Sequence, residues 1–320
     1  MKLARWVSHA LGALALMGLG LAPALAQDKL SLAIGQRGNW DTGVSELGQR
    51  AGIFKKHGLV LDILYTQGAG ESQQAVLAGS VDLGLVGTLG AFAAYVKGAP
   101  VRIVAAEATG SADFWYARAD STIRSMKDTD GKTVAYSTTG ASTHTMVLGF
   151  LKEAATSGKP VATGSPSATL IQVMSGQIDV GWSAPPFGIA QLNKNQIRVV
   201  AYGTDLRSVR DQTIRVLITM ADKRDSRPSV FARYVQAYRE TIDWMYAGDD
   251  ALKVYAEFAG VSIDIARQVR DQFFPKSLLV PDQVSGLPTL MEDAVAFKYI
   301  PKQLTKDQLA DLIRIPAAIK

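Results

Sequence analysis

The stretch Gly68-Ala-Gly-Glu-Ser-Gln-Gln-Ala-Val-Leu-Ala-Gly-Ser-Val-Asp-Leu-Gly-Leu-Val-Gly-Thr88 decides the fold that we expect for this chain. It begins as a loop of small residues up to Ser72, continues as a short helix, and reaches a helix stop at Gly79. Val81 to Val86 is typical of a buried strand, and Thr88 follows its end. A loop, a helix, a strand and a second loop in this order form one half of a ligand cradle.

The cradle has a second copy 97 residues further along the chain. Val76-Leu-Ala-Gly-Ser-Val-Asp-Leu-Gly-Leu-Val-Gly87 aligns without a gap with Val173-Met-Ser-Gly-Gln-Ile-Asp-Val-Gly-Trp-Ser-Ala184. A valine, a glycine, an aspartate and a second glycine recur in register. Helix-turn-strand units resemble each other in many proteins, so chance similarity is the alternative. The gap-free register favours a repeat, and the repeat predicts two α/β domains of the same design.

Strands alternate with helices along most of the chain. This alternation predicts βαβ units and mostly parallel sheets, whose ligands bind beyond the carboxyl ends of the strands. Asp41 or Thr42 is the expected N-cap of the first helix, and Ser137 to His144 is expected to be a polar loop. The predicted strands cover residues 30–34, 59–64, 81–86, 101–105, 132–136, 178–182, 197–201 and 214–219.

The last third of the chain changes character. After Pro228, large apolar residues recur at spacings of three and four, which predicts a long helix. We expect this helical tail to pack on the first domain. Further helical segments are predicted at residues 251–258, 263–273, 284–297 and 306–313.

The first residues have the pattern of an export signal. Lys2 and Arg5 form a basic start, Leu11 to Leu21 an apolar core, and Ala24-Leu25-Ala26 a small-residue cleavage site. A membrane anchor is the alternative, but the apolar run is short for a membrane span. The sequence therefore predicts cleavage after Ala26 and a soluble product in the periplasm.

Charge and composition restrict the partners. The formal net charge of +5 falls to +3 without Lys2 and Arg5, a mild bias that suits a small anion. Basic residues are scattered, so no nucleic-acid partner is expected. There is no cysteine, and we found neither a metal-ligand spacing nor a phosphate loop, so the sequence predicts no cofactor, no metal and no catalytic residue.

Several motifs together resemble a known family. In this order and spacing they are similar to the periplasmic substrate-binding proteins of ABC importers, in the nitrate/sulfonate/taurine branch that is related to thiamine-precursor binders. The motifs are Gly52-Ile-Phe-Lys-Lys-His-Gly-Leu59, Gly68 to Ser72, Ala78-Gly-Ser-Val-Asp-Leu-Gly84, Asp130-Gly-Lys-Thr-Val-Ala-Tyr136, Ser142-Thr-His144, Ser175-Gly-Gln-Ile-Asp179 and Ser226-Arg-Pro-Ser-Val-Phe231.

The resemblance implies a two-domain "Venus flytrap" of type II that closes on a small solute and delivers it to the permease subunits in the membrane. It implies domain 1 at residues 27–116 and 204–320, domain 2 at 117–203, and a monomer. The ligand is expected to be a sulfonate, taurine or nitrate-like anion. The ligand-binding residues that it implies are Asn39, Trp40, Gly70, Glu71, Ser72, Thr88, Ser142, Thr143, His144, Trp182 and Pro185.

Each of these residues also has a purely structural interpretation. Trp40 and Trp182 could pack in the core, and the serines and threonines could cap helices. Glu71 and Glu107 oppose a bare anion if both face the cleft, and then favour a ligand with N–H groups, such as a pyrimidine thiamine precursor. Arg37 is the nearest candidate counter-charge in the first domain, although a surface position is an alternative.

Two other classes of function stay open. An enzyme of a cofactor pathway can use the same architecture, and an acid-base pair of His144 with Ser137 or Glu71 is its simplest form. A sensor that presents its closed form to a membrane receptor would have the same sequence features as a transport protein.

Overall fold

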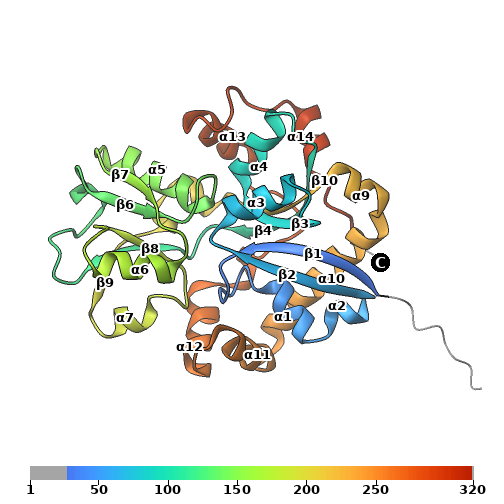
Figure 1. Cartoon of the computed structure of the whole chain (residues 1–320), viewed down its shortest axis with the longest axis horizontal. Coiled ribbons are helices and arrows are strands. Elements are labelled where there is room, and N and C mark those ends of the chain that lie inside the picture. The colour runs from blue at the N-terminus through green and yellow to red at the C-terminus, as the bar shows by residue number, and fades with distance from the viewer. Residues whose placement is uncertain (1–26, 319–320) are drawn as a thin grey trace, which may run out of the picture.

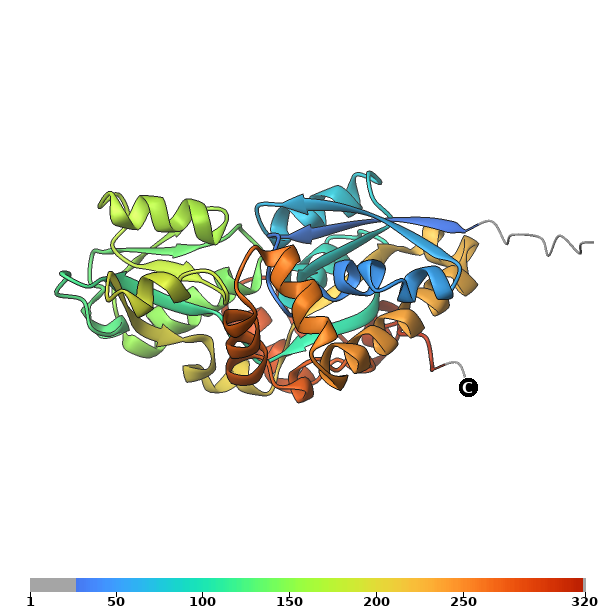
Figure 2. The ribbon, with the colours of Figure 1, turned by 90° about the horizontal axis from the view of Figure 1, so that it is seen from below.

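The computed structural model describes residues 27–318, which form two α/β halves joined side by side (Figure 1). The predicted export signal lies outside the described residues. In Figure 2, where the long axis lies across the picture, the half built from the middle of the chain is at one end, and the half that contains both described termini is at the other. Across residues 27–318, no helix combines the length and the apolar character that a membrane span needs.

The first half is built on a five-stranded sheet in the order β2-β1-β3-β10-β4. Strands β1, β2 and β3 pair in parallel, whereas β10 is antiparallel to both of its neighbours. Four of the five strands therefore run in one direction, as predicted. The strands are β1 (Asp28–Gly35), β2 (Leu59–Thr66), β3 (Leu83–Gly87), β4 (Val101–Thr109) and β10 (Thr213–Met220).

The second half repeats this arrangement with shorter strands. β6 and β7 pair in parallel, a bridge between Val134 and Val180 joins them to β8, and β5 lies antiparallel between β8 and β9. The resulting order β7-β6-β8-β5-β9 matches that of the first sheet strand for strand. The strands are β5 (Phe114–Arg118), β6 (Thr133–Tyr136), β7 (Lys159–Ala162), β8 (Gly181–Ser183) and β9 (Ile197–Tyr202).

Helices cover both faces of each sheet (Figure 1). Those before the second crossover are α1 (Val44–Arg50), α2 (Ile53–Lys56), α3 (Ala69–Leu77), α4 (Thr88–Val96), η1 (Met126–Asp128), α5 (Ser142–Ala154), α6 (Pro166–Met174), α7 (Ile189–Asn193), η2 (Gly203–Asp205) and α8 (Arg207–Arg210). The remaining ones are α9 (Ala221–Ser226), α10 (Pro228–Ala247), α11 (Asp250–Ala259), α12 (Ile263–Gln268), the π-helical turn η3 (Val269–Phe273), η4 (Lys276–Leu278), α13 (Leu287–Ala296) and α14 (Lys306–Leu312).

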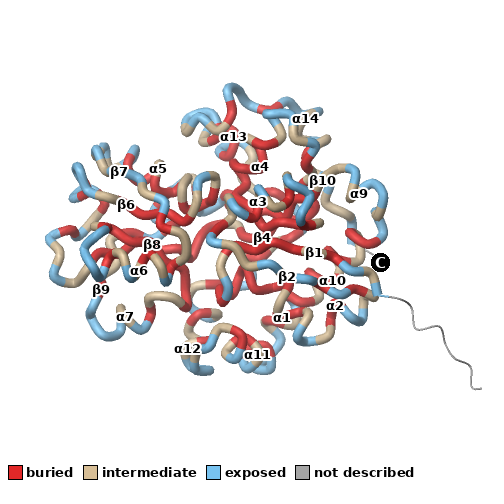
Figure 3. The backbone as a smooth tube through the Cα atoms, in the orientation of Figure 1, coloured by how far each residue is buried: buried red, intermediate tan, exposed pale blue. Residues whose placement is uncertain are grey.

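Side chains of the first sheet alternate between two apolar cores. Leu32 and Leu217 face one core, which α1, α2, α10 and α11 complete. Ala33 and Val216 face the other, which α3, α4, α13 and α14 complete. Figure 3 shows these strands as mostly buried and the outer helices as exposed on one side. The predicted helical tail therefore packs on the first half, on both faces of its sheet.

The internal repeat is confirmed by a pair of matching hydrogen-bond clamps. In the first half, the backbone N–H and Oγ of Ser31 donate to Asp82 Oδ2 at 2.9 and 3.0 Å, and Asp82 N donates to Ser31 Oγ at 2.9 Å. In the second half, Thr133 N and Oγ1 donate to Asp179 Oδ2, both at 2.9 Å, and Asp179 N donates to Thr133 Oγ1 at 2.8 Å. Each repeated aspartate thus ties its strand to the neighbouring parallel strand, which is β1 in the first half and β6 in the second.

Close packing of a helix on its strand explains why the valine and the glycine recur in both halves. A Cβ on Gly84 would lie 2.5 Å from Val76 Cγ2, and a Cβ on Gly181 would lie 2.7 Å from Val173 Cγ2. A helix can approach its own strand this closely only where the strand lacks a side chain. The repeat therefore encodes the packing of α3 on β3 and of α6 on β8.

Three local predictions are wrong. The N-cap of α1 is Gly43, with no side-chain cap, because Asp41 is turned toward Arg215 instead. Helix α3 begins at Ala69, so Glu71 lies in its first turn rather than in a loop. Helix α5 likewise begins at Ser142, inside the expected loop. In both helices a small residue without a capping side chain stands at the N-cap. The sequence therefore contains no capping residue that would mark where these helices begin.

The two halves are joined where β4 leads into β5 and where β9 leads into β10. The predicted boundary after residue 116 falls inside β5, a strand that pairs with β8 and β9 of the second sheet. We therefore place the proposed domain crossovers at residues 110–113 and 203–212, between the strands of the two sheets.

The close packing of α3 on β3 gives the first prediction. We expect Gly84→Ala to cost about 1–3 kcal/mol of unfolding free energy, because its Cβ overlaps Val76 Cγ2. The double variant Gly84→Ala/Val76→Ala should lose less than the sum of the two single losses, since shortening Val76 removes the overlap. Urea unfolding of the four proteins measures this coupling, and strictly additive losses would contradict it.

Candidate functional site

A cavity lies between the two halves, at the carboxyl ends of strands from both sheets. Its volume is about 20 Å³, which holds little more than a water molecule. A larger solute therefore needs the halves to move apart. The cavity is lined by Gly35, Gln36, Asn39, Thr42, Ala69, Leu85, Asp113, Ser137, Ala141, Ser142, Thr143, Trp182 and Arg215.

Arg215, on β10, is the charged centre of this site. Its Nε donates to Glu107 Oε2 at 2.8 Å, and its NH1 donates to Asp113 Oδ2 at 3.3 Å. Its NH2 forms a short ion pair with Asp41. NH1 also lies 3.4 Å from Ser142 Oγ of α5, so the same guanidinium reaches across to the second half. One cation thus serves three buried carboxylates, which we call the carboxylate cluster.

Burial governs the protonation of this cluster. Desolvation raises the pKa of Glu107 from its ordinary value of 4.5 to about 8, although the charge of Arg215 opposes the shift. Desolvation likewise raises the pKa of Asp113 against the attraction of Arg215. Burial disfavours the charged form of Arg215, but the three carboxylates outweigh burial and hold its pKa well above the ordinary value. At neutral pH, Glu107 is therefore largely protonated and Arg215 is charged.

The second half contributes the start of α5 to the cavity. Ala141 is the N-cap of this helix and offers no capping side chain. Thr143 Oγ1 accepts from the backbone N–H of Ser137 at 3.0 Å and lies 2.8 Å from Ser137 Oγ, which fixes the loop before the helix. The N–H groups and the positive end of the helix dipole at Ser142 and Thr143 therefore point toward the cavity, an arrangement that favours an anion.

Three polar atoms at or behind the cavity are buried and have no hydrogen-bond partner among residues 27–318. Asn39 Oδ1 and Trp182 Nε1 belong to residues that line the cavity, and Glu107 Oε1 lies behind Arg215. Buried polar atoms are normally paired, so an unpaired one indicates a partner that the protein does not supply. Among the lining residues, the first half offers the Asn39 acceptor and the second half offers the Trp182 donor.

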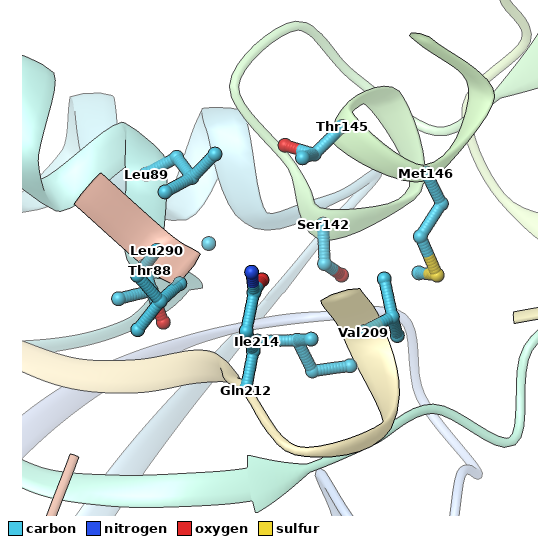
Figure 4. Close-up of a pocket in the computed structure, with 10 residues that line it drawn as sticks. Thr88, Leu89, Ser142, Thr145, Met146, Val209, Gln212, Ile214 and Leu290 are labelled. Atoms are coloured by element: carbon cyan, nitrogen blue, oxygen red, sulfur yellow. The ribbon is translucent and has the colours of Figure 1, made fainter. Parts of the chain in front are cut away.

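Four of the predicted ligand-binding residues, Asn39, Ser142, Thr143 and Trp182, line this cavity. Pro185 is buried in the chain that follows β8 and is not among the lining residues. Thr88 lines a neighbouring cavity of about 20 Å³, with Ser142, Thr145, Met146 and Gln212 around it (Figure 4). Thr88 Oγ1 donates to the backbone carbonyl of Thr213, so its hydroxyl holds β10 in place.

The other predicted residues have structural partners. Trp40 is fully buried, donates from Nε1 to Tyr246 Oη at 2.9 Å, and packs edge-on against Tyr255. Ser72 Oγ lies 2.9 Å from Thr66 Oγ1. Glu71 is exposed and accepts from the backbone N–H of Gln67 at 2.9 Å. Neither Trp40, Ser72 nor Glu71 lines the central cavity.

Gly70 and His144 lie where the two halves touch. The N–H of Gly70 donates to Thr138 Oγ1 at 2.9 Å, and a Cβ at Gly70 would lie 2.3 Å from the carbonyl oxygen of Thr139. His144 Nδ1 lies 3.0 Å from Tyr299 Oη, beside an open cavity of about 320 Å³. Burial lowers the pKa of His144. Both residues therefore join the halves outside the central cavity.

Sequence reasoning missed Arg215, Asp41 and Asp113. The available signal was Arg215 itself, a charged residue in the middle of the predicted buried strand 214–219. A charge in a buried strand needs buried partners, but the partners come from three distant segments. Arg37, the predicted counter-charge, instead lies with its guanidinium 5.2 Å from the ring centre of Phe258. Across residues 27–318, no group of acidic, histidine or cysteine side chains has the arrangement of a metal site.

The comparisons with known proteins agree with this fold. A family model described as NMT1/THI5 like matches residues 46–252. The structure is similar to the alkanesulfonate-binding protein SsuA from Xanthomonas axonopodis pv. citri bound to MOPS, at 16% identity and a TM-score of 0.76, covering 91% of this chain and 100% of that one. It is also similar to the nitrate-binding protein NrtA from Synechocystis PCC 6803, at 14% identity and 0.70, covering 90% and 86%.

An enzyme has a similar fold as well. The desulfurization enzyme DSZB matches at 17% identity and a TM-score of 0.61, covering 88% of this chain and 96% of that one. No curated protein sequence matches the chain. At these identities the structural likenesses show the fold, and they confirm the predicted two-domain architecture of periplasmic binding proteins.

The buried position of Arg215 gives the second prediction. We expect Arg215→Met to lose about 3–5 kcal/mol of unfolding free energy, because it leaves a buried carboxylate cluster without its counter-charge. Arg118→Met is the matched control, because Arg118 pairs with Asp120 at the surface and its loss should stay within about 0.5 kcal/mol. Urea unfolding measures both, and equal losses would contradict the central role of Arg215.

The protonation of Glu107 gives the third prediction. Because its pKa is higher in the folded protein than in the unfolded chain, its contribution to stability falls as the pH rises from about 4.5 to about 8. Glu107→Gln removes this contribution, so its unfolding free energy relative to that of the wild type should increase from about pH 5 to about pH 8. Glu153→Gln, at an exposed position, is the control and should follow the wild type at both values. A pH-independent difference for Glu107→Gln would show that Glu107 is ionised throughout.

Proposed function

Since the chain belongs to the NMT1/THI5-like family, we propose that it is the solute-binding component of an ABC import system. It captures a small solute between its two halves and delivers it to a membrane permease. The observation that carries this proposal is the central cavity, to which both halves contribute buried polar atoms that lack a partner. Export to the periplasm and function as a monomer belong to the same proposal.

Closure of the two halves is the proposed capture step. Contacts between Gly70 and Thr138 and between Arg215 and Ser142 cross from one half to the other beside the cavity. Gly87 allows a similarly close approach of the two halves, since a Cβ there would lie 2.6 Å from the carbonyl oxygen of Gly140. Such contacts exist only when the halves are closed, so a solute that completes the closed cavity shifts the population toward that form.

The proposed solute carries an anionic group, as in a sulfonate, taurine or nitrate. The supporting donors are the free start of α5 and the unpaired Nε1 of Trp182, both on the second half. The names of SsuA and NrtA, which bind an alkanesulfonate and nitrate, agree with such a ligand. A nitrogenous solute such as a pyrimidine is the second candidate, because Asn39 Oδ1 is an unpaired acceptor in the same cavity.

Catalysis is the less favoured proposal. The predicted acid-base pairs require His144, and its Nδ1 lies against Tyr299 Oη outside the central cavity. Ser137 instead contacts Thr143, and Glu71 accepts a hydrogen bond from the backbone N–H of Gln67. A general base has to reach the atom from which it takes a proton, and neither pair is assembled here. We therefore propose binding without chemistry.

A thermal-shift experiment tests the proposed site. At least one of a panel of alkanesulfonates, taurine and nitrate should raise the unfolding midpoint, because a ligand of the folded state stabilises it by mass action. Trp182→Phe should abolish that increase, since it removes the Nε1 donor and keeps an aromatic ring. If none of these compounds raises the midpoint and only cationic or uncharged compounds of a second panel do, the anion proposal is wrong.

The control for this experiment is Trp115→Phe. Trp115 is fully buried and donates from Nε1 to the carbonyl of Ala135 within the second half, away from the cavity. This variant should unfold at a lower temperature than the wild type and still respond fully to the ligand. A full response in Trp182→Phe would rule out the proposed contact.

A further inference from the structure

The two walls of the central cavity present opposite kinds of hydrogen-bonding group. Its second-half wall presents donors, namely Trp182 Nε1 and the N–H groups at the start of α5. Its first-half wall and the adjoining crossover present acceptors, namely Asn39 Oδ1 and the carboxylate of Asp113. A solute that fills the cavity therefore meets hydrogen-bond donors at one end and acceptors at the other.

The one basic side chain that lines the cavity is already paired with carboxyl groups. Arg215 is the only lysine or arginine among the residues that line the cavity, and three carboxylates share it. Its guanidinium donates to all three carboxyl groups and reaches Ser142, so its hydrogen-bonding capacity is already in use. The first-half wall therefore offers no free positive charge to an anion.

Asn39 and Asp113 can each accept a further hydrogen bond. Asn39 is 3% exposed, and its Oδ1 has no partner. Asp113 is also 3% exposed, and the hydrogen bonds that it accepts, from Ser111 Oγ and Arg215 NH1, both use Oδ2. An N–H group between these two side chains would pair the orphaned amide oxygen and donate to Asp113 Oδ1, which accepts neither of these two bonds.

We infer that the solute is a compact zwitterion whose ammonium or other N–H donor end binds between Asn39 and Asp113, while its anionic end binds at α5 and Trp182. This inference rests on the proposed function and narrows its ligand. The two candidate classes, the anion and the nitrogenous solute, become the two ends of one molecule. Asn39 and Asp113 are then the residues that exclude bare anions.

The expected discrimination is large. A ligand without the N–H group leaves Asn39 Oδ1 buried and unpaired and places its own charge near Asp113. Sites built to pair a polar group reject analogues that lack it by up to about 10⁴–10⁵-fold. We therefore expect the amino compound of a matched pair to bind at least about 100-fold more tightly than its amine-free partner.

Matched pairs of small ligands test this inference by titration calorimetry on residues 27–320. The pairs are 2-aminoethanesulfonate with ethanesulfonate, and β-alanine with propionate. The N,N,N-trimethyl derivative of 2-aminoethanesulfonate keeps the positive charge but has no N–H, so it separates hydrogen bonding from charge alone. We expect the amino member of a pair to bind and both the amine-free and the trimethylated compounds to bind at least about 100-fold more weakly.

Two variants assign the N–H end to its residues. Asp113→Asn should weaken binding of the amino compound and strengthen binding of its amine-free partner, because it replaces a carboxyl oxygen by an amide group that donates. Asn39→Leu should weaken binding of the amino compound only. Asn193→Leu is the matched control, because Asn193 is exposed at the end of α7, and it should change neither affinity.

The outcomes distinguish this inference from the proposed function. If the amino and amine-free compounds bind equally and Asp113→Asn weakens both equally, the zwitterion is overturned while solute capture stands. If only amine-free anions bind, the N–H end is overturned in the same way. If none of the five probes binds to the wild type, the zwitterion is overturned, and the thermal-shift panel decides separately whether solute capture stands.

Discussion

A buried guanidinium among three carboxylates is the constraint on which much of this structure depends. Arg215 lies on β10, the strand that the chain forms after its second crossover, and its partners come from the loop after β1, from β4 and from the first crossover. Removing Arg215 would leave this buried carboxylate cluster without its counter-charge. The cluster therefore fixes the first crossover and the first loop to the same sheet, and through Ser142 it also contacts the second half.

Around this centre, the fold is one unit used twice. The matching aspartate clamps and the matching valine-glycine contacts set the same helix against the same strand in each half. The carboxyl ends of the two sheets then face each other, as two cradles that share one cavity. The repeat is in the framework only. The cavity walls differ, because Asn39 and Asp113 stand on one side and Trp182 stands on the other.

This asymmetry links the framework to the proposed function. A cavity with acceptors on one wall and donors on the other orients a solute and rewards one that pairs with both walls at once. The glycines at positions 70 and 87 allow the second half to approach closely enough for this to happen. Recognition and closure are thus produced by the same contacts, which is what a capture protein needs.

The order of most strands and helices, the internal repeat, the packing of the helical tail and the family could be predicted from the sequence, although β7 was missed. These properties depend on local patterns, since apolar periodicity and in-register glycines act within a few residues.

Of the site, the sequence predicted Asn39, Ser142, Thr143 and Trp182 as ligand-binding residues, and the structure places all four in one cavity lining. Only the tertiary structure decided that Arg215 is paired with Asp41, Glu107 and Asp113, and that Trp40 and Glu71 lie elsewhere. The physical reason is distance along the chain: electrostatic partners from four segments have no spacing that a linear pattern can reveal.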